Sequence, residues 1–161
     1  MITALKTNWM NVLGYAGLIP FLGFAALVAL CDDTDMATTL ANYNLLYGLA
    51  IISFLGAVHW GLAIALSHHH EAPVYLAGID QEAFETRSFI WGVTPSLLAW
   101  LASAFASTQL ALWILTFVLL LVWFVDRHFL KPMRVFDHYL KLRTHLTWGA
   151  ALGLGVTACF A

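Results

Sequence analysis

Residues Tyr43–Leu66 read YNLLYGLAIISFLGAVHWGLAIAL, an apolar run with the length of a membrane-crossing helix. A helix needs about 20 mostly apolar residues to span the hydrocarbon core of a bilayer. At about 100° per residue, the small and polar residues of this run share one side of the helix. Lipid tails offer no partner to an imidazole or indole N–H, so we expect that side to face other helices: Gly48, Ile52, Ser53, Gly56, His59, Trp60, Ala63 and Ser67. We expect the opposite side to face lipid: Ala50, Ile51, Phe54, Leu55, Val58, Leu62 and Ala65.

Four further stretches of the 161-residue chain are similarly apolar: Asn11–Leu30, Ser88–Ala106, Gln109–Val125 and Leu142–Phe160. Hydrophobic residues make up 61% of the chain and charged residues only 10%, against about 25% charged in a soluble domain. The sequence therefore predicts an all-α polytopic membrane protein, a bundle of five transmembrane helices in a single domain over residues 1–161. The net charge of −2 gives no reason to expect a nucleic-acid partner.

The charges between the spans predict the orientation. The first loop holds Asp32, Asp33 and Asp35 and no base, whereas the loop before the last span is basic, with Arg127, Lys131, Arg134 and Lys141 and with Arg143 at its edge. Basic loops stay in the cytoplasm. We therefore expect a cytoplasmic N-terminus, an external C-terminus at Ala161, and residence in the inner membrane of a bacterium.

Two longer loops remain outside the spans. The second, His68–Arg87, opens with His68-His69-His70-Glu71 and ends in a segment, Ile79–Arg87, that we expect to form a short surface helix. Adjacent histidines on an exposed loop make a poor preorganised metal site, so we expect a solvated loop and no metal. The fourth loop, Asp126–Lys141, alternates aromatic and basic residues, a pattern typical of the headgroup layer.

His59 is the ionisable residue well inside the most informative span. An intramembrane ionisable residue suggests a functional site, but a neutral histidine that fixes helix packing explains it too. Arg143 has Asp126 as its expected partner at the cytoplasmic ends of the last two spans, beside Ser67 and His68, although lipid phosphate is an alternative. We expect a polar packing or ligand-binding cluster formed by Ser53, Gly56, His59, Trp60, Asp126, Arg143 and Thr147.

Other pairings are open from the sequence. His59 and His145 have the residue type that ligates haem or copper, but no third ligand is evident, and the cofactor is unknown. Cys31 and Cys159 end spans on the same side, so a disulfide and two free thiols are both compatible with the sequence.

Several segments together resemble a known family. They are Leu13-Gly14-Tyr15 to Phe21, Tyr47-Gly48, Ser53-Phe54-Leu55-Gly56 with His59-Trp60-Gly61, Thr94-Pro95-Ser96, and Leu142–Thr147. They look like the uncharacterised membrane family that includes mitochondrial transmembrane protein 69. The resemblance covers almost the whole chain. It implies a small multi-span protein of bacterial inner membranes and mitochondria, and no established reaction.

Three function classes are compatible with these features. The short loops and the lack of recognisable catalytic motifs favour a noncatalytic accessory or assembly subunit of a larger membrane complex, with a protein partner or a second copy of the chain and with membrane lipid around it. The alternatives are a bundle that binds an apolar ligand, lipid or quinone, and a small transporter. We do not expect an enzyme.

Overall fold

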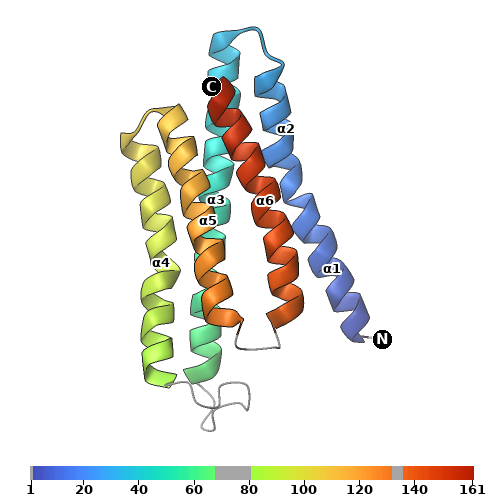
Figure 1. The fold of residues 1–161 in the computed structure, drawn as a ribbon, viewed down its shortest axis with the longest axis vertical. Coiled ribbons are helices and arrows are strands. Elements are labelled where there is room, and N and C mark those ends of the chain that lie inside the picture. Colours follow the sequence, from blue (N-terminus) through green and yellow to red (C-terminus); the bar gives the residue numbers. More distant parts are fainter. Residues whose placement is uncertain (1, 68–80, 132–135) are drawn as a thin grey trace.

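The protein is an elongated bundle of helices (Figure 1). A computed structural model describes the backbone of residues 2–67, 81–131 and 136–161 and the side chains of residues 9–65, 82–131 and 136–161. The helices are α1 (Ile2–Ala16), α2 (Leu18–Ala29), α3 (Thr34–Ser67), α4 (Gln81–Phe105), α5 (Thr108–Leu130) and α6 (Asp137–Phe160). The described residues contain no strand, which confirms the all-helical fold. The chain ends lie toward opposite ends of the bundle (Figure 1).

The predicted first span is interrupted at Gly17, and α1 and α2 follow one another as a single bent rod (Figure 1). The interruption is small because the Gly17 N–H lies within hydrogen-bond distance of both the Leu13 and Gly14 carbonyl oxygens. Pro20 is the third residue of α2, where the missing N–H costs little because the first turn of a helix has no internal acceptor for it. Its side chain is half-buried.

Helix α3 is the central element, with contacts to α2, α4, α5 and α6. It begins nine residues before the predicted span, because Asp33 caps it. The Asp33 carboxylate accepts hydrogen bonds from the backbone N–H groups of Asp35 and Met36 at 2.9 and 3.1 Å, which satisfies donors that the first turn leaves free. At 1.5 Å per residue its 34 residues extend about 51 Å, well beyond a hydrocarbon core of about 30 Å.

Two predicted boundaries are wrong. Ile79–Arg87 does not form a separate surface helix, because α4 runs without a break from Gln81 through Arg87 to Phe105. The fourth loop is also shorter than Asp126–Lys141, since α5 continues to Leu130 and α6 begins at Asp137. In both places a helix continues past the apolar run. Charged residues at the end of a helix can stay helical because their long side chains reach into the headgroup layer. The prediction for His68–Glu71 lies outside the described residues.

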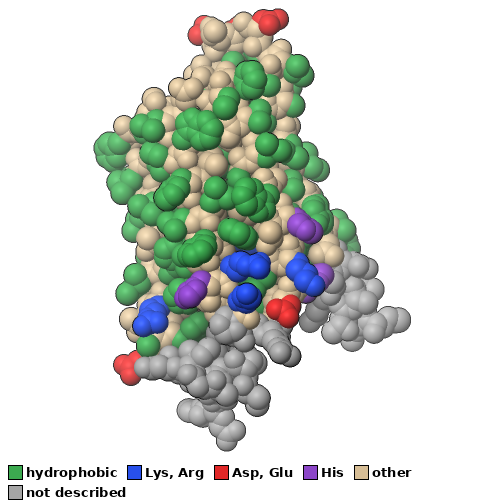
Figure 2. Space-filling view, in the orientation of Figure 1, with side chains coloured by type: hydrophobic (Ala, Val, Ile, Leu, Met, Phe, Trp, Pro, Cys, Tyr) green, Lys and Arg blue, Asp and Glu red, His purple; other side chains and the backbone are tan. Residues whose placement is uncertain are grey.

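Four helical runs in the described part of the chain are long and apolar enough to cross a membrane: Trp9–Ala29, Thr34–Ala65, Glu82–Phe105 and Thr108–Leu130. These runs indicate a multi-pass membrane protein. Green apolar side chains cover the length of the visible face, while Lys, Arg and His side chains gather toward the end of the bundle that holds the N-terminus (Figure 2).

The predicted inner side of α3 is largely correct. Gly48, Ile52, Gly56, His59 and Ala63 are buried, and Phe54 on the opposite side is exposed. Leu55 is an error, because it was expected in lipid and is buried. The reason is the central position of α3, which packs against four other helices, so a residue outside the predicted inner side also meets protein.

Candidate functional site: a buried charged cluster beside an apolar cavity

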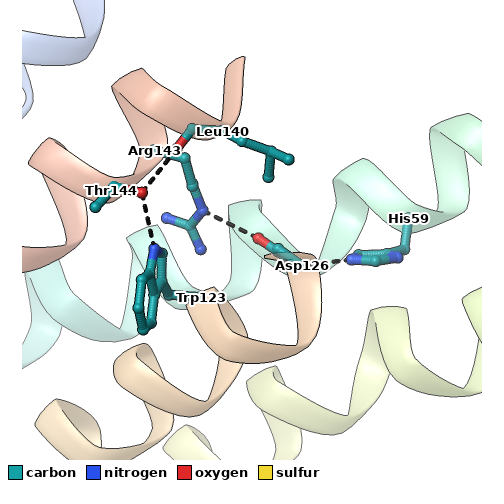
Figure 3. Close-up of polar contacts among 6 residues, drawn as sticks. All are labelled: His59, Trp123, Asp126, Leu140, Arg143 and Thr144. Carbon is teal, nitrogen blue, oxygen red and sulfur yellow. Dashed lines mark hydrogen bonds and ion pairs between the residues drawn. The ribbon is translucent and has the colours of Figure 1, made fainter. Parts of the chain in front are cut away.

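Three helices bring one ionisable residue each to the same buried place: His59 on α3, Asp126 on α5 and Arg143 on α6 (Figure 3). One carboxylate oxygen of Asp126, Oδ1, accepts a hydrogen bond from Nε2 of His59 at 2.8 Å. The other oxygen, Oδ2, accepts from Nε of Arg143 at 3.0 Å. The exposed fractions are 2%, 2% and 5% for His59, Asp126 and Arg143, so the cluster is shielded from the surroundings of the bundle.

The expected contact between Asp126 and Arg143 is therefore present as an ion pair. The carboxylate also contacts His59, which lies two turns of α3 deeper in the bundle than Ser67. The side chains of Ser67 and His68, which were expected beside the pair, lie outside the described residues. The deeper position follows from α5, which continues past Asp126 to Leu130 and so carries the carboxylate into the helix bundle. An ion pair taken out of water needs good geometry and further hydrogen bonds to offset the lost hydration, and the second carboxylate contact to His59 supplies one.

Aromatic and hydroxyl groups hold the cluster in place. The Phe129 ring lies edge-on to the His59 imidazole, with centroids 6.2 Å apart. On the other side, the Trp123 indole N–H donates to the Thr144 hydroxyl at 3.0 Å, and that hydroxyl donates to the Leu140 carbonyl at 2.8 Å (Figure 3). These contacts join α5 to α6 next to Arg143, so the guanidinium is fixed by packing as well as by charge.

The cluster keeps unused hydrogen-bonding capacity. Among the described residues, Nη2 of Arg143, Nδ1 of His59 and Oγ1 of Thr147 are buried without a protein partner. Buried polar atoms are rarely left unpaired, because each costs about 1–3 kcal/mol when it loses water and gains nothing. Atoms of this kind mark places where a ligand or an ordered water completes the site.

A cavity of about 420 Å³ borders the cluster. Arg143 and Thr147 contribute to its wall, as does Tyr139. Apart from these three, the lining consists of apolar side chains and glycine from α1, α2, α3, α5 and α6: Met10, Leu13, Gly14, Gly17, Leu18, Phe21, Ile51, Phe54, Leu55, Val58, Leu119, Leu142, Leu146 and Ala150. Several lining residues, among them Leu13 and Phe54, are exposed on the outside of the bundle, so the cavity reaches its lateral surface.

The other predicted site residues lie apart from the cavity. Trp60 is 42% exposed, and its indole N–H donates to the Phe89 carbonyl on α4 at 2.8 Å. Gly56 is buried against Gly92 of α4. The Ser53 hydroxyl donates to the Leu49 carbonyl of its own helix. These three residues serve the packing of α3, whereas Thr147 lines the cavity beside Arg143.

Two further sequence alternatives are resolved by the geometry. His145 is exposed, and its Nδ1 lies 3.1 Å from the Tyr15 hydroxyl, so it does not join His59. No group of three or more metal-ligating side chains occurs within the described residues. Cys31 and Cys159 are both free thiols.

Sequence reasoning also missed polar residues that join helices, among them Asn44 and Tyr47. The Asn44 amide on α3 donates to the Thr157 hydroxyl on α6 at 2.6 Å and to the Phe21 carbonyl on α2 at 3.3 Å. The Tyr47 hydroxyl donates to the Gly17 carbonyl at 3.0 Å, at the break between α1 and α2. The signal was present for Asn44, because an amide within a membrane span needs a partner on a neighbouring helix.

Comparison with known proteins gives a family without an assigned activity. Neither a curated protein nor a solved structure matches the chain. A family model described as "Protein of unknown function (DUF3429)" matches residues 7–159, which include every residue of the charged cluster and of the cavity wall. The chain therefore belongs to the DUF3429 family.

Proposed function

We propose that this protein binds an apolar membrane ligand, a lipid or a quinone, in the cavity beside Arg143. The observation that carries the proposal is the cavity itself, whose walls come from five helices far apart in the sequence. Its volume of about 420 Å³ lies within the range of about 300–1,000 Å³ that is usual for small-molecule sites.

The composition of the walls supports an apolar occupant. Fourteen of the lining residues named above are apolar or glycine, and three carry a polar group. An unfilled space of this size forfeits the dispersion contacts of every atom along its wall, and a hydrocarbon chain that enters from the lateral surface restores them. The surrounding bilayer is itself a source of such chains.

The membrane arrangement belongs to the same proposal. We propose five crossings, with α6 as the fifth beside the four apolar runs, because α6 packs along both α2 and α5. The N-terminus and the basic residues at the same end of the bundle then face the cytoplasm of a bacterium and Ala161 faces outward. The kinship with mitochondrial transmembrane protein 69 is part of this proposal as well.

The role as accessory or assembly subunit of a larger complex stays a second candidate. Large apolar side chains are exposed along every transmembrane helix, including Trp100, Trp113 and Phe117. Lipid can cover these side chains, and so can a protein partner or a second copy of the chain. Extraction from native membranes in a mild detergent tests this role, because a partner would copurify in a fixed ratio.

The ligand proposal is tested by filling the cavity. Val58 lines it, while the neighbouring Ala57 is exposed and contributes nothing to its wall. We expect Val58→Trp to remove a lipid or quinone that copurifies with the wild-type protein and to leave the fold intact, whereas Ala57→Trp retains the ligand. Mass spectrometry of organic extracts measures the loss. Equal ligand content in both variants, or no ligand in the wild-type protein, would rule out the cavity as a binding site.

A further inference from the structure

We propose that the occupant of this cavity is a neutral amphiphile whose carbonyl oxygen accepts hydrogen bonds from Arg143 and Thr147. The inference rests on the proposed function and adds to it the chemical class of the ligand's polar head. Two kinds of membrane molecule carry such an oxygen: an acyl lipid has an ester carbonyl, and a quinone has a ring carbonyl.

The cavity wall supplies hydrogen-bond donors that have no partner among the described residues. Arg143 uses Nε for Asp126, while its Nη2 is buried and has no partner among the described residues. The Thr147 hydroxyl is also buried and has no partner within the described part of the chain, and Thr147 is only 1% exposed. Both residues line the cavity. A ligand oxygen that accepts from both would satisfy two buried groups at once, and a hydrogen bond is stronger where the local dielectric constant is low.

The two donors lie together on one helix. Arg143 and Thr147 are four residues apart on α6, so their side chains are neighbours on one face of the helix. The walls beyond them, from Leu18 and Phe21 on α2 and from Ile51 on α3, offer no polar side chain. The cavity also has length, since its lining residues Tyr139 and Ala150 are separated by about 16 Å along α6 at 1.5 Å per residue. All three polar lining residues, Tyr139, Arg143 and Thr147, lie at i, i+4 and i+8 on α6 and so form one polar wall opposite apolar side chains. A cavity with one polar wall fits an amphiphile with a single polar head.

The charge of the cluster limits the kind of polar head that can bind. The positive charge of Arg143 is already matched by the carboxylate of Asp126, so the cluster is neutral when His59 is neutral. A carboxylate or phosphate head would leave an excess negative charge in a place of low dielectric constant, which is costly. A carbonyl group adds no charge. The electrostatics of the cluster therefore favour a neutral acceptor over an anionic one.

The test uses four probes with the same ten-carbon tail, added to the purified protein in lipid nanodiscs: decane, methyl decanoate, decanoate and a decyl-substituted benzoquinone. Binding is measured by native mass spectrometry and by the shift in melting temperature. We expect both carbonyl probes to bind more tightly than decane and decanoate at neutral pH. Tighter binding of the quinone assigns the head to a quinone ring, and tighter binding of the ester assigns it to an acyl lipid.

Thr147→Val is the decisive variant, because it removes the hydroxyl and retains the shape of the side chain. Losing one hydrogen bond should weaken binding of the carbonyl probes roughly three- to tenfold and leave decane unchanged. The matched control is Thr116→Val, since the Thr116 hydroxyl donates to Leu112 of its own helix and lines no part of the cavity.

The outcomes distinguish a wrong assignment of the polar head from a wrong assignment of the cavity as a ligand site. If decane binds as tightly as the carbonyl probes, or if Thr147→Val changes nothing, the cavity holds a ligand but the carbonyl assignment is wrong. If decanoate binds most tightly, the head is an anion and the inference is overturned. If no probe binds and Val58→Trp has no effect on copurifying ligand, the proposed function itself fails.

Discussion

Gly56 of α3 lies directly against the carbonyl oxygen of Gly92 on α4. A Cβ atom at Gly56 would collide with that oxygen, and a Cβ atom at Gly92 would collide with the Trp60 indole. Close approach of two backbones through glycine is a common way for helices to pack in lipid, where association rests on van der Waals contact. The relationship fixes the spacing of α3 and α4 and thereby the position of His59, three residues further along α3.

We expect Gly56→Leu to reduce the yield of folded protein in detergent, because the backbone of Gly92 has no freedom to yield to a side chain. Overpacking of this kind costs about 1–3 kcal/mol and often more. Val58→Leu, two residues away, adds its methylene beside a cavity and should change the melting temperature little. Equal tolerance at the two positions would mean that α3 and α4 do not pack through Gly56.

The ion pair of Asp126 and Arg143 predicts a strong and non-additive effect. Removing one partner of a buried pair costs about 3–5 kcal/mol, because the other charge stays buried alone. We expect Arg143→Ala to lower the melting temperature far more than Arg127→Ala, whose side chain is exposed at the same end of the bundle. Asp126→Asn should repeat most of the loss. The double mutant should resemble either single mutant, and simple addition of the two effects would show that the residues are not coupled.

His59 should contribute through its hydrogen bond to Asp126. We expect His59→Leu to lower stability by about 1–3 kcal/mol, the cost of leaving a buried carboxylate oxygen without one of its donors. His59→Gln, which can still donate, should lose less. His128 is the matched control, because it is exposed in the last turn of α5 and its replacement by leucine should have little effect. Thermal unfolding in detergent measures all three variants, and equal losses for His59→Leu and His128→Leu would contradict a structural role for the contact.

The proposed orientation of the bundle predicts the side of the membrane on which fused reporters appear. A reporter fused after Ala161 should read as periplasmic, and so should one inserted at Asp33. The C-terminus and the connection between α2 and α3, which holds Asp33, both lie toward the end of the bundle opposite the N-terminus (Figure 1). A reporter before Met1 should read as cytoplasmic. A cytoplasmic signal at Ala161 together with a periplasmic signal at Asp33 would remove α6 as a crossing.

Local patterns in the sequence predicted the helices and the buried side of α3. Apolar length makes a stretch helical in lipid, because a bilayer offers no partner for free backbone N–H and C=O groups. The gathering of Gly48, Gly56 and His59 on one side of α3 then predicted which side meets protein. The contact between Asp126 and Arg143 was also predicted from the sequence, because Asp126 follows one apolar run and Arg143 begins the next.

Only the tertiary structure decided what those residues meet. His59 and Asp126 are 67 positions apart in sequence, and no pattern within either helix encodes the rotation and depth at which α3 and α5 pack. The burial of Leu55 has the same origin, because it depends on how many helices surround α3. The cavity depends on five helices at once, and it exists where their side chains fail to fill the space between α1 and α6. Backbone hydrogen bonding in lipid is satisfied within each helix, so a single segment determines it, whereas rotation, depth and voids depend on side-chain packing between helices.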